Sequence, residues 1–541
     1  MAEIVLINPK FTPSYWGLNY AMPLLDAKAV LPVINLPLLA ALTPRQHAVT
    51  LIDENVEEID FDRCAGADIV GLTGMNVQRV RVHEILRELK RRGVFTVVGG
   101  PWVTVFEEDF GDLADVVFVG EADETWPRFL AEWVEGRHAG RYEQLAKTDI
   151  TRLPTPRFDL LPMAKYAYGP LQVSRGCPFT CEFCDIIVVF GRRPRVKTAA
   201  QVIAELEDLA AAGRHNCFIV DDNLVGNKRA VKPILREIIK WQEAHGYPLS
   251  FATEASIDLA EDEELMRLMV DANIDNVFVG IESPNEAALR ETKKIQNLAD
   301  RQGTMLEKVH RIQRAGLEVW SGMIVGFDSD DERVFEEQRR FVQEARIVQA
   351  MINTLVAIPR TPLYARLERE GRLDNSGEMG DFGTLTTNVI PARISRSALR
   401  EGYLELMQDL YAPEAYFARM DALYLDDKLL PALGRRRYLR RHPWRWLRSR
   451  SWATVETLFV FVQLMRLVPD KQLRSTYRSR LWRVLIRRPH ITLLRLYCVK
   501  CALHFHADRL VSEMLAQGAA LAPVNMDNDS PRSEATASAA A

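Results

Sequence analysis

The stretch SRGCPFTCEFCD, from Ser174 to Asp185, carries three of the seven cysteines in the chain. Cys177, Cys181 and Cys184 are spaced Cys-x3-Cys-x2-Cys, in a loop that follows a short apolar run at 169–173, predicted to be a strand. Thiolates are strong metal ligands, so three of them in one loop are suited to hold a metal or a cluster. We therefore expect this loop to be the chemical centre of the molecule.

Two other uses of three cysteines are disfavoured. A disulfide framework needs an even number of cysteines, and seven cysteines in 541 residues are typical of a reducing compartment. A structural zinc site closes with four protein ligands, and the nearest further candidate is His215. An iron–sulfur cluster held by three cysteines leaves one iron open, where a cofactor or substrate can bind.

Length and composition predict several domains and no membrane span. A chain of 541 residues with 48% hydrophobic content can bury two to four cores. The first residues, MAEIVLINPK, have the pattern of a strand and not of an export signal. The longest apolar run, 457–468, is shorter than the roughly 18 residues of a spanning helix. We expect a cytoplasmic protein, peripheral on the inner face of the cytoplasmic membrane.

The net charge of −4 conceals a strong asymmetry. Between Arg435 and Lys500 there are 18 Lys or Arg residues and two acids, a local charge of +16, so the rest of the chain carries −20. Such segregation predicts a separate basic surface near the C-terminus.

The first 151 residues show buried Val and Ile runs that alternate with helical patterns. This alternation predicts a doubly wound, Rossmann-like parallel sheet. The helical pattern is clearest at 80–92, which ends at a glycine, and the strand-like runs are 4–7, 49–52, 69–73, 95–98 and 116–119.

Turn residues follow these strands, at the edge where such sheets bind ligands. They are Asn8-Pro9, Thr73-Gly74, Gly99-Gly100 and Gly120-Glu121. One glycine at a strand end is usually a plain turn residue, but four such ends favour a ligand crevice. No GxGxxG is present, so a dinucleotide is not indicated.

A second strand–helix alternation begins after a proline-rich linker. Its strand-like runs number six, counting 169–173, and are followed by 217–220, 249–253, 276–280, 318–325 and 351–357. Six such units predict a partial (β/α)6 barrel, with its site at the carboxyl ends of the strands. The predicted division is 1–151 first sheet, 152–165 linker, 166–375 barrel, 376–518 mainly helical region and 519–541 disordered tail.

Several motifs together resemble those of a known family. The cysteine triad, with an aromatic residue before its last cysteine, resembles the radical S-adenosylmethionine (SAM) superfamily. The strings DENVEE, GGPWVT and GEAD, which begin at Asp53, Gly99 and Gly120, are similar to the cobalamin-binding domain of one subgroup. Within it, VDDNLVGN, FVGIESP, IPRTPLY and GYLELMQDLY resemble the hopanoid C-2 methylases. The resemblance covers residues 1 to about 430.

The resemblance implies three cofactors: a [4Fe-4S] cluster, SAM and cobalamin. It implies that the three loop cysteines bind the cluster. The SAM-binding residues would be Phe183, Asp221, Asp222, Glu254, Gly280 and Glu282, and the cobalamin-binding residues Pro9, Thr73, Gly74, Gly99, Gly100, Gly120 and Glu121. It further implies a one-electron donor such as flavodoxin or ferredoxin, and two domains stacked so that both reactive centres reach one carbon.

Two features depart from other cobalamin proteins. The motif DxHxxG, whose histidine ligates cobalt in other cobalamin folds, is absent, and neither His47 nor His83 lies in that context. Trp102 stands where many relatives have histidine. We expect cobalamin to be bound without a protein histidine as its lower ligand.

The expected activity is radical SAM methyl transfer to an unactivated carbon of a hopanoid-like polycyclic lipid. A second interpretation keeps the same cofactors for oxidative cyclisation or rearrangement of another ring substrate. A third is an iron–sulfur sensor that binds nucleic acid.

The basic region at 434–452, GRRRYLRRHPWRWLRSRSW, interleaves Arg with Trp, Tyr and Leu. This pattern favours an interfacial contact with anionic lipid, ahead of packing on the acidic body and of nucleic-acid binding. Cys498 and Cys501, with His504 and His506, form a weak metal motif that apolar surroundings make more typical of a buried core.

Overall fold

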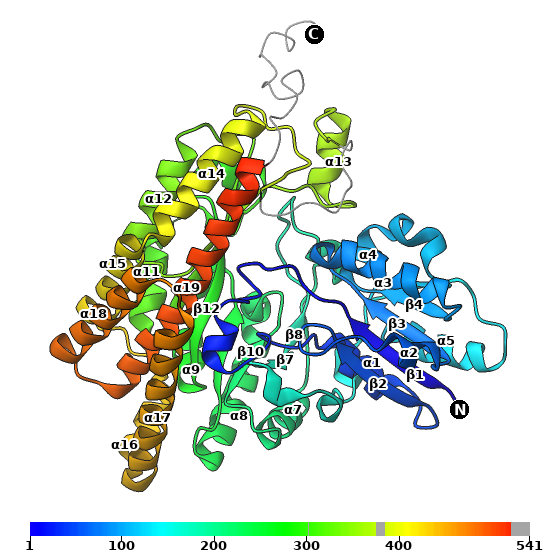
Figure 1. The fold of residues 1–541 in the computed structure, drawn as a ribbon, viewed down its shortest axis with the longest axis horizontal. Coiled ribbons are helices and arrows are strands. Elements are labelled where there is room, and N and C mark those ends of the chain that lie inside the picture. The colour runs from blue at the N-terminus through cyan, green and yellow to red at the C-terminus, as the bar shows by residue number, and fades with distance from the viewer. Residues whose placement is uncertain (301, 375–384, 521–541) are drawn as a thin grey trace, which may run out of the picture.

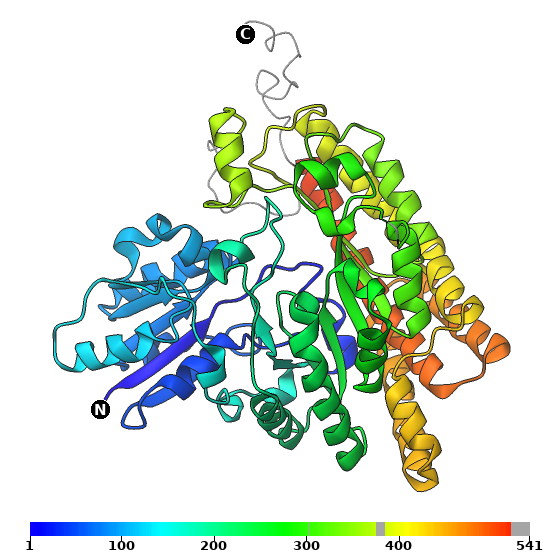
Figure 2. The same ribbon diagram turned by 180° about the vertical axis from the view of Figure 1, so that it is seen from behind.

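The computed structural model describes residues 1–300, 302–374 and 385–520. They form an N-terminal sheet, a second sheet curved into an open barrel, and a layer of C-terminal helices on the far side of that barrel (Figures 1 and 2). The predicted α/β architecture with a helical C-terminal region is confirmed.

The N-terminal sheet is parallel, with strand order β2-β1-β3-β4-β5-β6. Its strands are β1 Glu3–Asn8, β2 Ala48–Asp53, β3 Ile69–Thr73, β4 Thr96–Gly99, β5 Val116–Val119 and β6 Arg141–Glu143. The helices are α1 Asn35–Leu42, α2 Phe61–Ala65, α3 Arg79–Arg91, α4 Pro101–Val105 and α5 Thr125–Val134. β6 is a short edge strand that the apolar pattern did not predict.

Both faces of this sheet are buried, as a doubly wound fold requires. Because side chains alternate along a strand, Val5 and Ile7 of β1 enter one apolar cluster, with α3 and α4. Ile4 and Leu6 enter another, with α1 and α5. This two-sided burial leaves the strand ends as the place where the sheet can meet a ligand.

The second sheet is also parallel, with order β14-β13-β12-β11-β10-β7. Its strands are β7 Gly169–Leu171, β10 Asn216–Ile219, β11 Ser250–Glu254, β12 Ile274–Glu282, β13 Glu318–Val325 and β14 Ala350–Thr354. The outer helices are α7 Ala199–Ala211, α8 Lys228–His245, α9 Glu263–Asp271, α11 Met305–Ala315 and α12 Val334–Glu344. β7 and β14 are the two edges, so the barrel is open.

A small antiparallel ribbon, β8 Ser174–Arg175 with β9 Arg195–Val196, brackets the three-cysteine loop and the short helix α6 Ile186–Val189. The sequence analysis did not predict it. The ribbon fixes both ends of the loop, so the cysteines lie in a loop that leaves the barrel and is closed at its base.

The C-terminal helices are α14 Arg396–Tyr411, α15 Pro413–Asp421, α16 Leu433–Arg440, α17 Pro443–Leu467, α18 Lys471–Arg487 and α19 Ile491–Ala520. Of these, α14 and α19 pack along the β13–β14 side of the second sheet, away from the N-terminal sheet (Figure 1). Two short helices, α10 Glu286–Glu291 and α13 Pro362–Arg369, come before them in the chain. None of the helices in the described part of the chain is long and apolar enough to cross a membrane. The disordered tail predicted at 519–541 lies outside the described residues from 521 onward.

The segment between β1 and α1 reaches across to the C-terminal helix α19. Tyr15 stacks on Tyr411 with 5.7 Å between ring centroids. The His506 ring nitrogen Nε2 lies 3.0 Å from the carbonyl oxygen of Ser14, and the backbone N–H of Tyr20 donates to Nδ1. The two ends of the chain are therefore joined on the side of the barrel.

Candidate active site

The three-cysteine loop begins with a backbone turn that only glycine adopts without strain. Gly176 has φ +94°, and a Cβ there would lie 2.9 Å from the carbonyl oxygen of Gly191. The next residue, Cys177, donates its N–H to that same carbonyl at 3.3 Å. The loop is thereby closed on itself before the second cysteine.

The three thiols are free of disulfides, and Cys181 is buried while the other two are half-buried. The Asn223 amide Nδ2 lies 3.7 Å from the sulfur of Cys177, and Gln296 Nε2 lies 3.6 Å from that of Cys181. Burial raises the pKa of Cys177 and of Cys184, while Lys294 acts to lower the pKa of both thiols. Amide donors and a cation around buried sulfurs suit thiolates in a cluster.

No group of three or more His, Cys, Asp or Glu side chains in the described ranges is placed to hold a single metal ion. The three thiols with their amide and lysine neighbours fit a [4Fe-4S] cluster, which distributes its cysteines over several iron atoms.

Asp221 and Asp222 follow β10, and both contact the backbone that leads into the loop. Asp221 accepts the N–H of Val173 and the hydroxyl of Ser174, both at 2.7 Å. Asp222 accepts the N–H of Gly176 at 2.7 Å. These bonds hold the start of the loop against the barrel.

Three carboxyl groups gather at this corner of the barrel. Burial raises the pKa of Asp221 to about 7, that of Asp222 to about 6 and that of Glu254 to about 8, and repulsion by Asp222 adds to the rise for Asp221 and Glu254. No ion pair joins any of the three to a cation within the described ranges. A positively charged ligand such as SAM would favour the ionised form of these carboxyl groups, so the corner suits it.

Glu282 ends β12 in an unusual conformation. Its φ is +63°, and the pairing register with β13 shifts between Gly280 and Glu282. The carboxylate forms an ion pair with Lys294 at 2.7 Å. Gly280 leaves room for this pair, because a Cβ there would lie 2.8 Å from Lys294 Nζ.

Phe183 lies next to the same lysine. Its ring centroid is 5.9 Å from Lys294 Nζ and 6.1 Å from the ring of Phe327. Lys294 thus lies near Phe183, Glu254 and Glu282 and near the cysteines of the loop.

The carboxyl edge of the N-terminal sheet is built from closely packed backbone. Gly74 donates its N–H to the carbonyl of Gly99 at 3.2 Å. Gly100 has φ +114°, and a Cβ there would lie 2.8 Å from the nitrogen of Gly74. The hydroxyl of Thr73 accepts from Asn35 at 2.7 Å. These glycines are required first by the packing of adjacent strand ends.

Two further predicted cobalamin residues join parts of the chain. The carbonyl oxygen of Pro9 accepts from Gln78 at 2.5 Å. Glu121 has almost no exposed side chain and forms ion pairs with Arg175 at 3.0 Å and Arg195 at 2.8 Å, the residues of the β8–β9 ribbon. Glu121 therefore connects the sheet edge to the three-cysteine loop.

Gly120, which directly precedes Glu121, lies in a turn with φ +97°. A Cβ there would lie 2.7 Å from the carbonyl oxygen of Gln144, so this position also requires glycine.

Polar atoms at this edge remain available to a ligand. The side-chain oxygens of Asn76 and Thr125 are buried and have no hydrogen-bond partner. Trp102 does not reach them, because its ring is buried and its Nε1–H donates to Asp109 at 3.2 Å. The edge thus fits a polar ligand such as cobalamin, whose corrin periphery bears amides.

The two histidines weighed from the sequence are engaged elsewhere. His83 Nε2 lies 3.0 Å from Asp109, and His47 Nδ1 accepts the N–H of Ala2 at 3.2 Å. Both histidines thus make contacts within the N-terminal sheet region.

Sequence reasoning missed Lys294, Gln296 and the role of Arg175 and Arg195. Lys294 and Gln296 lie in the turn after α10, where no periodicity or motif marks them. Arg175 and Glu121, which form an ion pair, are 54 residues apart in the sequence. Only the packing of one domain on the other brings these groups together.

The Cys498–His506 motif is part of the core. Cys498, Cys501, His504 and His506 are buried. His504 contacts the hydroxyl of Tyr477 at 2.8 Å and the carbonyl of Tyr411 at 3.1 Å, so both ring nitrogens are used. The interpretation as buried packing residues is supported over a metal site.

Three family models match the chain. The B12 binding domain matches residues 23–130, the radical SAM superfamily matches residues 171–341, and a domain of unknown function matches residues 361–519. The first two coincide with the sheet and the barrel described above.

Similar proteins include two bacterial relatives and a solved structure. An uncharacterised methyltransferase of Synechocystis is 39% identical over 77% of each chain. The hopanoid C-2 methylase of Rhodopseudomonas palustris is 33% identical over 77% of this chain and 79% of that one. The cobalamin-dependent SAM radical enzyme OxsB, at 14% identity, shares the fold with a TM-score of 0.60, covering 98% of this chain and 82% of that one.

The cofactors of this class are a [4Fe-4S] cluster, SAM and cobalamin. The thiol loop, the carboxyl corner and the polar sheet edge each fit one of them. The chain belongs to the cobalamin-dependent radical SAM methyltransferases.

Proposed function

We propose that this enzyme methylates a hopanoid-like polycyclic lipid at C-2. The observation that carries the substrate is the 33% identity to a hopanoid C-2 methylase over 77% of the chain, which includes both cofactor domains. Apolar side chains on two central strands of the barrel support an apolar substrate.

The side chains that face the inside of the barrel are apolar or absent on two central strands. Buried residues alternate with half-buried ones on β12 from Phe278 onward and on β13 from Trp320 onward, and we assign these half-buried positions to the lumen face; Asp275, at the start of β12, is half-buried as well. The lumen positions include Phe278 and Gly280 on β12, and Trp320, Gly322 and Ile324 on β13. A Cβ at Gly322 would lie 2.8 Å from Cζ of Phe278, so the tip of this ring occupies the space beside the glycine.

We assign the binding roles as follows. Cys177, Cys181 and Cys184 hold the cluster, with Asn223 and Gln296 donating to two of the sulfurs. Asp222 and Glu254 receive the cationic groups of SAM, and Phe183 packs by its adenine. When bound, these cofactors supply a hydrogen-abstracting radical and a transferable methyl group.

The remaining predicted residues position these groups. Asp221 fixes the backbone before the loop, and the Lys294–Glu282 pair keeps a positive charge beside the sulfurs. The residues at the end of the N-terminal sheet, Pro9, Thr73, Gly74, Gly99, Gly100, Gly120 and Glu121, form the floor on which cobalamin rests.

We place the exposed face of α17 and α18 on the membrane that contains the lipid. α17 buries Thr457, Val460 and Leu464 and turns its other apolar residues outward. Trp444 is 84% exposed, Trp482 64% and Leu458 61%. Exposed tryptophans among arginines are typical of an interfacial helix.

Incubation of the reduced, reconstituted enzyme with methyl-labelled SAM and a hopanoid tests the substrate. We expect labelled 2-methylhopanoid, with one methyl transferred per 5'-deoxyadenosine formed. If 5'-deoxyadenosine forms and an unlabelled, ring-modified product appears, the cyclisation interpretation replaces ours. Lipid profiling of a host without the gene, which should lose one methylated lipid, gives the same answer in the cell.

Liposome flotation tests the membrane face. We expect replacement of Trp444, Leu458 and Trp482 by Ser to reduce partitioning onto vesicles by about a thousandfold or more, since three large apolar side chains together contribute ~4.5–9 kcal/mol when buried. The buried face of α17 is untouched, so thermal stability should not change. Equal flotation of both proteins would contradict the assignment.

A further inference from the structure

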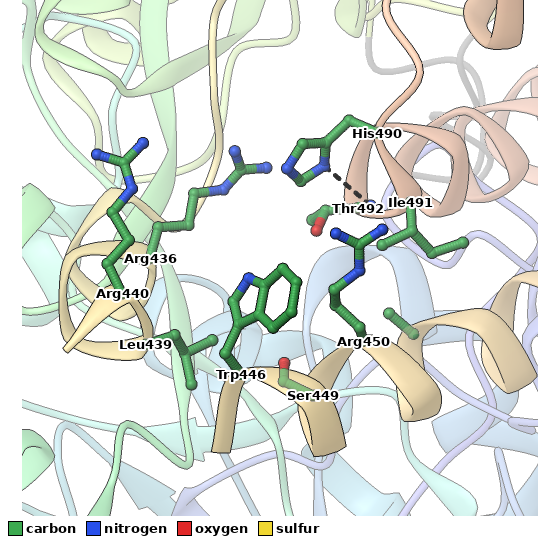
Figure 3. Close-up of a pocket in the computed structure, with 10 residues that line it drawn as sticks. Arg436, Leu439, Arg440, Trp446, Ser449, Arg450, His490, Ile491 and Thr492 are labelled. Carbon is green, nitrogen blue, oxygen red and sulfur yellow. Dashed lines mark hydrogen bonds between the residues drawn. The ribbon is translucent and has the colours of Figure 1, made fainter. Parts of the chain in front are cut away.

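A basic pocket lies at the junction of α16, α17 and the start of α19, far from the cysteine loop in the sequence. It encloses about 100 Å³ and is lined by Arg436, Arg440, Trp446, Arg450, His490 and Thr492, with four other residues. This volume far exceeds the roughly 15 Å³ that one water needs. Figure 3 shows Arg436 and Arg450 approaching from two sides, with Trp446 between them and His490 opposite.

The cations of this pocket have no anionic partner. Nε and Nη2 of Arg436 are buried and make no hydrogen bond. No ion pair within the described ranges reaches Arg436, Arg440 or Arg450. The nearby acids are engaged elsewhere: Asp271 with Arg437, and Glu456 with Arg495 at 2.7 Å. Buried, unpaired guanidinium atoms are costly unless a ligand completes them.

The local electrostatics act in the same direction. Burial, and then repulsion by Arg488 and Arg440, lower the pKa of Arg436 to about 10. Burial and three arginines likewise lower the pKa of His490. Both shifts show that the pocket carries excess positive charge, which a bound anion would relieve.

The backbone adds to this potential. α19 starts at Ile491 and is 30 residues long, so the positive end of its dipole opens at the pocket. His490 Nδ1 accepts the N–H of Thr492 at 3.3 Å (Figure 3), which leaves Nε2 as the donor of the neutral ring. Arg450 is held over the ring of Trp446, 4.7 Å from its centroid. The donors are therefore arranged before any ligand arrives.

We propose that this pocket binds a phosphate group through Arg436, Arg450 and His490. A planar guanidinium binds phosphate oxygens in a bidentate manner, and two of them with a helix start form a complete cradle. The exposed apolar residues of α17 lie on the same helix, Trp452 being 61% and Val455 60% exposed. They favour the phosphate of a phospholipid as the source over free phosphate. The site does not depend on which lipid is methylated.

The test compares Arg450→Gln with Arg448→Gln in the full-length protein. Both variants remove one positive charge from α17, but only Arg450 lines the pocket. Flotation is measured with vesicles of digalactosyldiacylglycerol alone, which lack phosphate, and with added phosphatidylglycerol. High salt is used throughout, because it screens non-specific attraction and spares buried contacts. Calorimetry with inorganic phosphate and flotation competition by a DNA oligonucleotide complete the set.

We expect Arg450→Gln to lose at least about tenfold in binding to phosphatidylglycerol vesicles, as for a charge-assisted hydrogen bond, and Arg448→Gln to behave as wild type. Loss of inorganic-phosphate binding in Arg450→Gln alone, with equal flotation, would assign the site to free phosphate. Two variants that match each other in both assays would overturn the site. So would a defect of Arg450→Gln confined to DNA. Neither assay measures methyl transfer, so the result can be interpreted even if the enzyme does not methylate the proposed substrate.

Discussion

Adjacent residues can have different roles, as Asp221 and Asp222 show. The family resemblance implied that both bind SAM. In the structure both carboxylate oxygens of Asp221 accept hydrogen bonds, from the N–H of Val173 and the hydroxyl of Ser174, whereas Asp222 accepts one hydrogen bond, from the N–H of Gly176. The motif locates the site to within a residue, but hydrogen bonds to distant backbone decide which oxygen is left for a ligand. No single-sequence pattern contains that information.

The cysteine triad makes the sharpest prediction at this scale. Cys181→Ala should abolish the cluster absorbance and reduce 5'-deoxyadenosine formation to background, because two cysteines cannot hold the cluster. Cys64→Ala is the matched control, since Cys64 is also buried but lies in the N-terminal sheet region. Turnover that survives in Cys181→Ala would remove the basis of the assignment.

A second prediction concerns pH. Asp330 is buried and accepts the N–H groups of Gly326 and Phe327 at 2.9 Å, and burial raises its pKa to about 7. Since the folded pKa exceeds the unfolded value, its contribution to stability is full below about pH 4 and is lost as pH rises through 7. Asp330→Asn keeps an accepting oxygen and should flatten the fall in melting temperature between pH 5 and 8.

The neighbouring Asp331→Asn provides the control for that experiment. Its ion pair with Arg333 is exposed and holds the pKa of Asp331 at about 2, so the variant should leave the pH profile unchanged. Equal profiles of Asp330→Asn and wild type would show that the carboxyl is not the titrating group.

At the scale of elements, strong periodicity was sufficient to predict the longer strands and helices, whereas the shortest elements could not be predicted from the sequence. The buried runs of β1, β3 and β13 and the amphipathic α3 follow their predicted ranges closely. The three-residue β6 and the β8–β9 ribbon have too few residues to show a period of two, and they form because other strands offer them an edge. The sharp turn at Glu282, a non-glycine residue with φ +63°, could not be predicted from the sequence either.

The attachment of α19 to the barrel depends on a buried ion pair. Lys500 pairs with Glu318 of β13, and its Nζ lies 5.0 Å from the Trp320 ring centroid. Lys500→Met leaves the carboxylate unpaired and should lower the free energy of unfolding of this unit by about 3–5 kcal/mol. Adding Glu318→Gln should restore most of it, as read from urea unfolding midpoints.

Lys240→Met removes an exposed lysine whose pair with Glu237 spans one helical turn. It should cost less than about 1 kcal/mol. A comparable loss in Lys240→Met and Lys500→Met would mean that the buried pair contributes no more than a surface pair.

At the scale of the whole molecule, the two cofactor domains meet through charged contacts. Glu121 and Asp123 follow β5 and pair with Arg175, which directly precedes the loop glycine. We expect Glu121→Gln to separate two activities: SAM cleavage should stay within about twofold, while methyl transfer falls about tenfold or more, because placement of reacting centres accounts for large rate factors. The ratio of methylated product to 5'-deoxyadenosine measures this.

Glu124→Gln serves as the comparison, since Glu124 is exposed three residues further along. It should leave both activities unchanged. If Glu121→Gln lowers cleavage and transfer in equal proportion, the residue stabilises the loop itself and does not align the domains.

The contact between Ser14 and His506 spans 492 residues of chain. At ribosomal rates of ~5–20 residues per second, about 25–100 s separate the synthesis of its two halves. Over this interval the N-terminal sheet can already pair with the barrel through Glu121 and Arg175, but it lacks its contact with α19. A chain released early would carry both cofactor domains without the contact between Ser14 and His506. The attachment of the segment after β1 to α19 therefore forms only after α19 has been made.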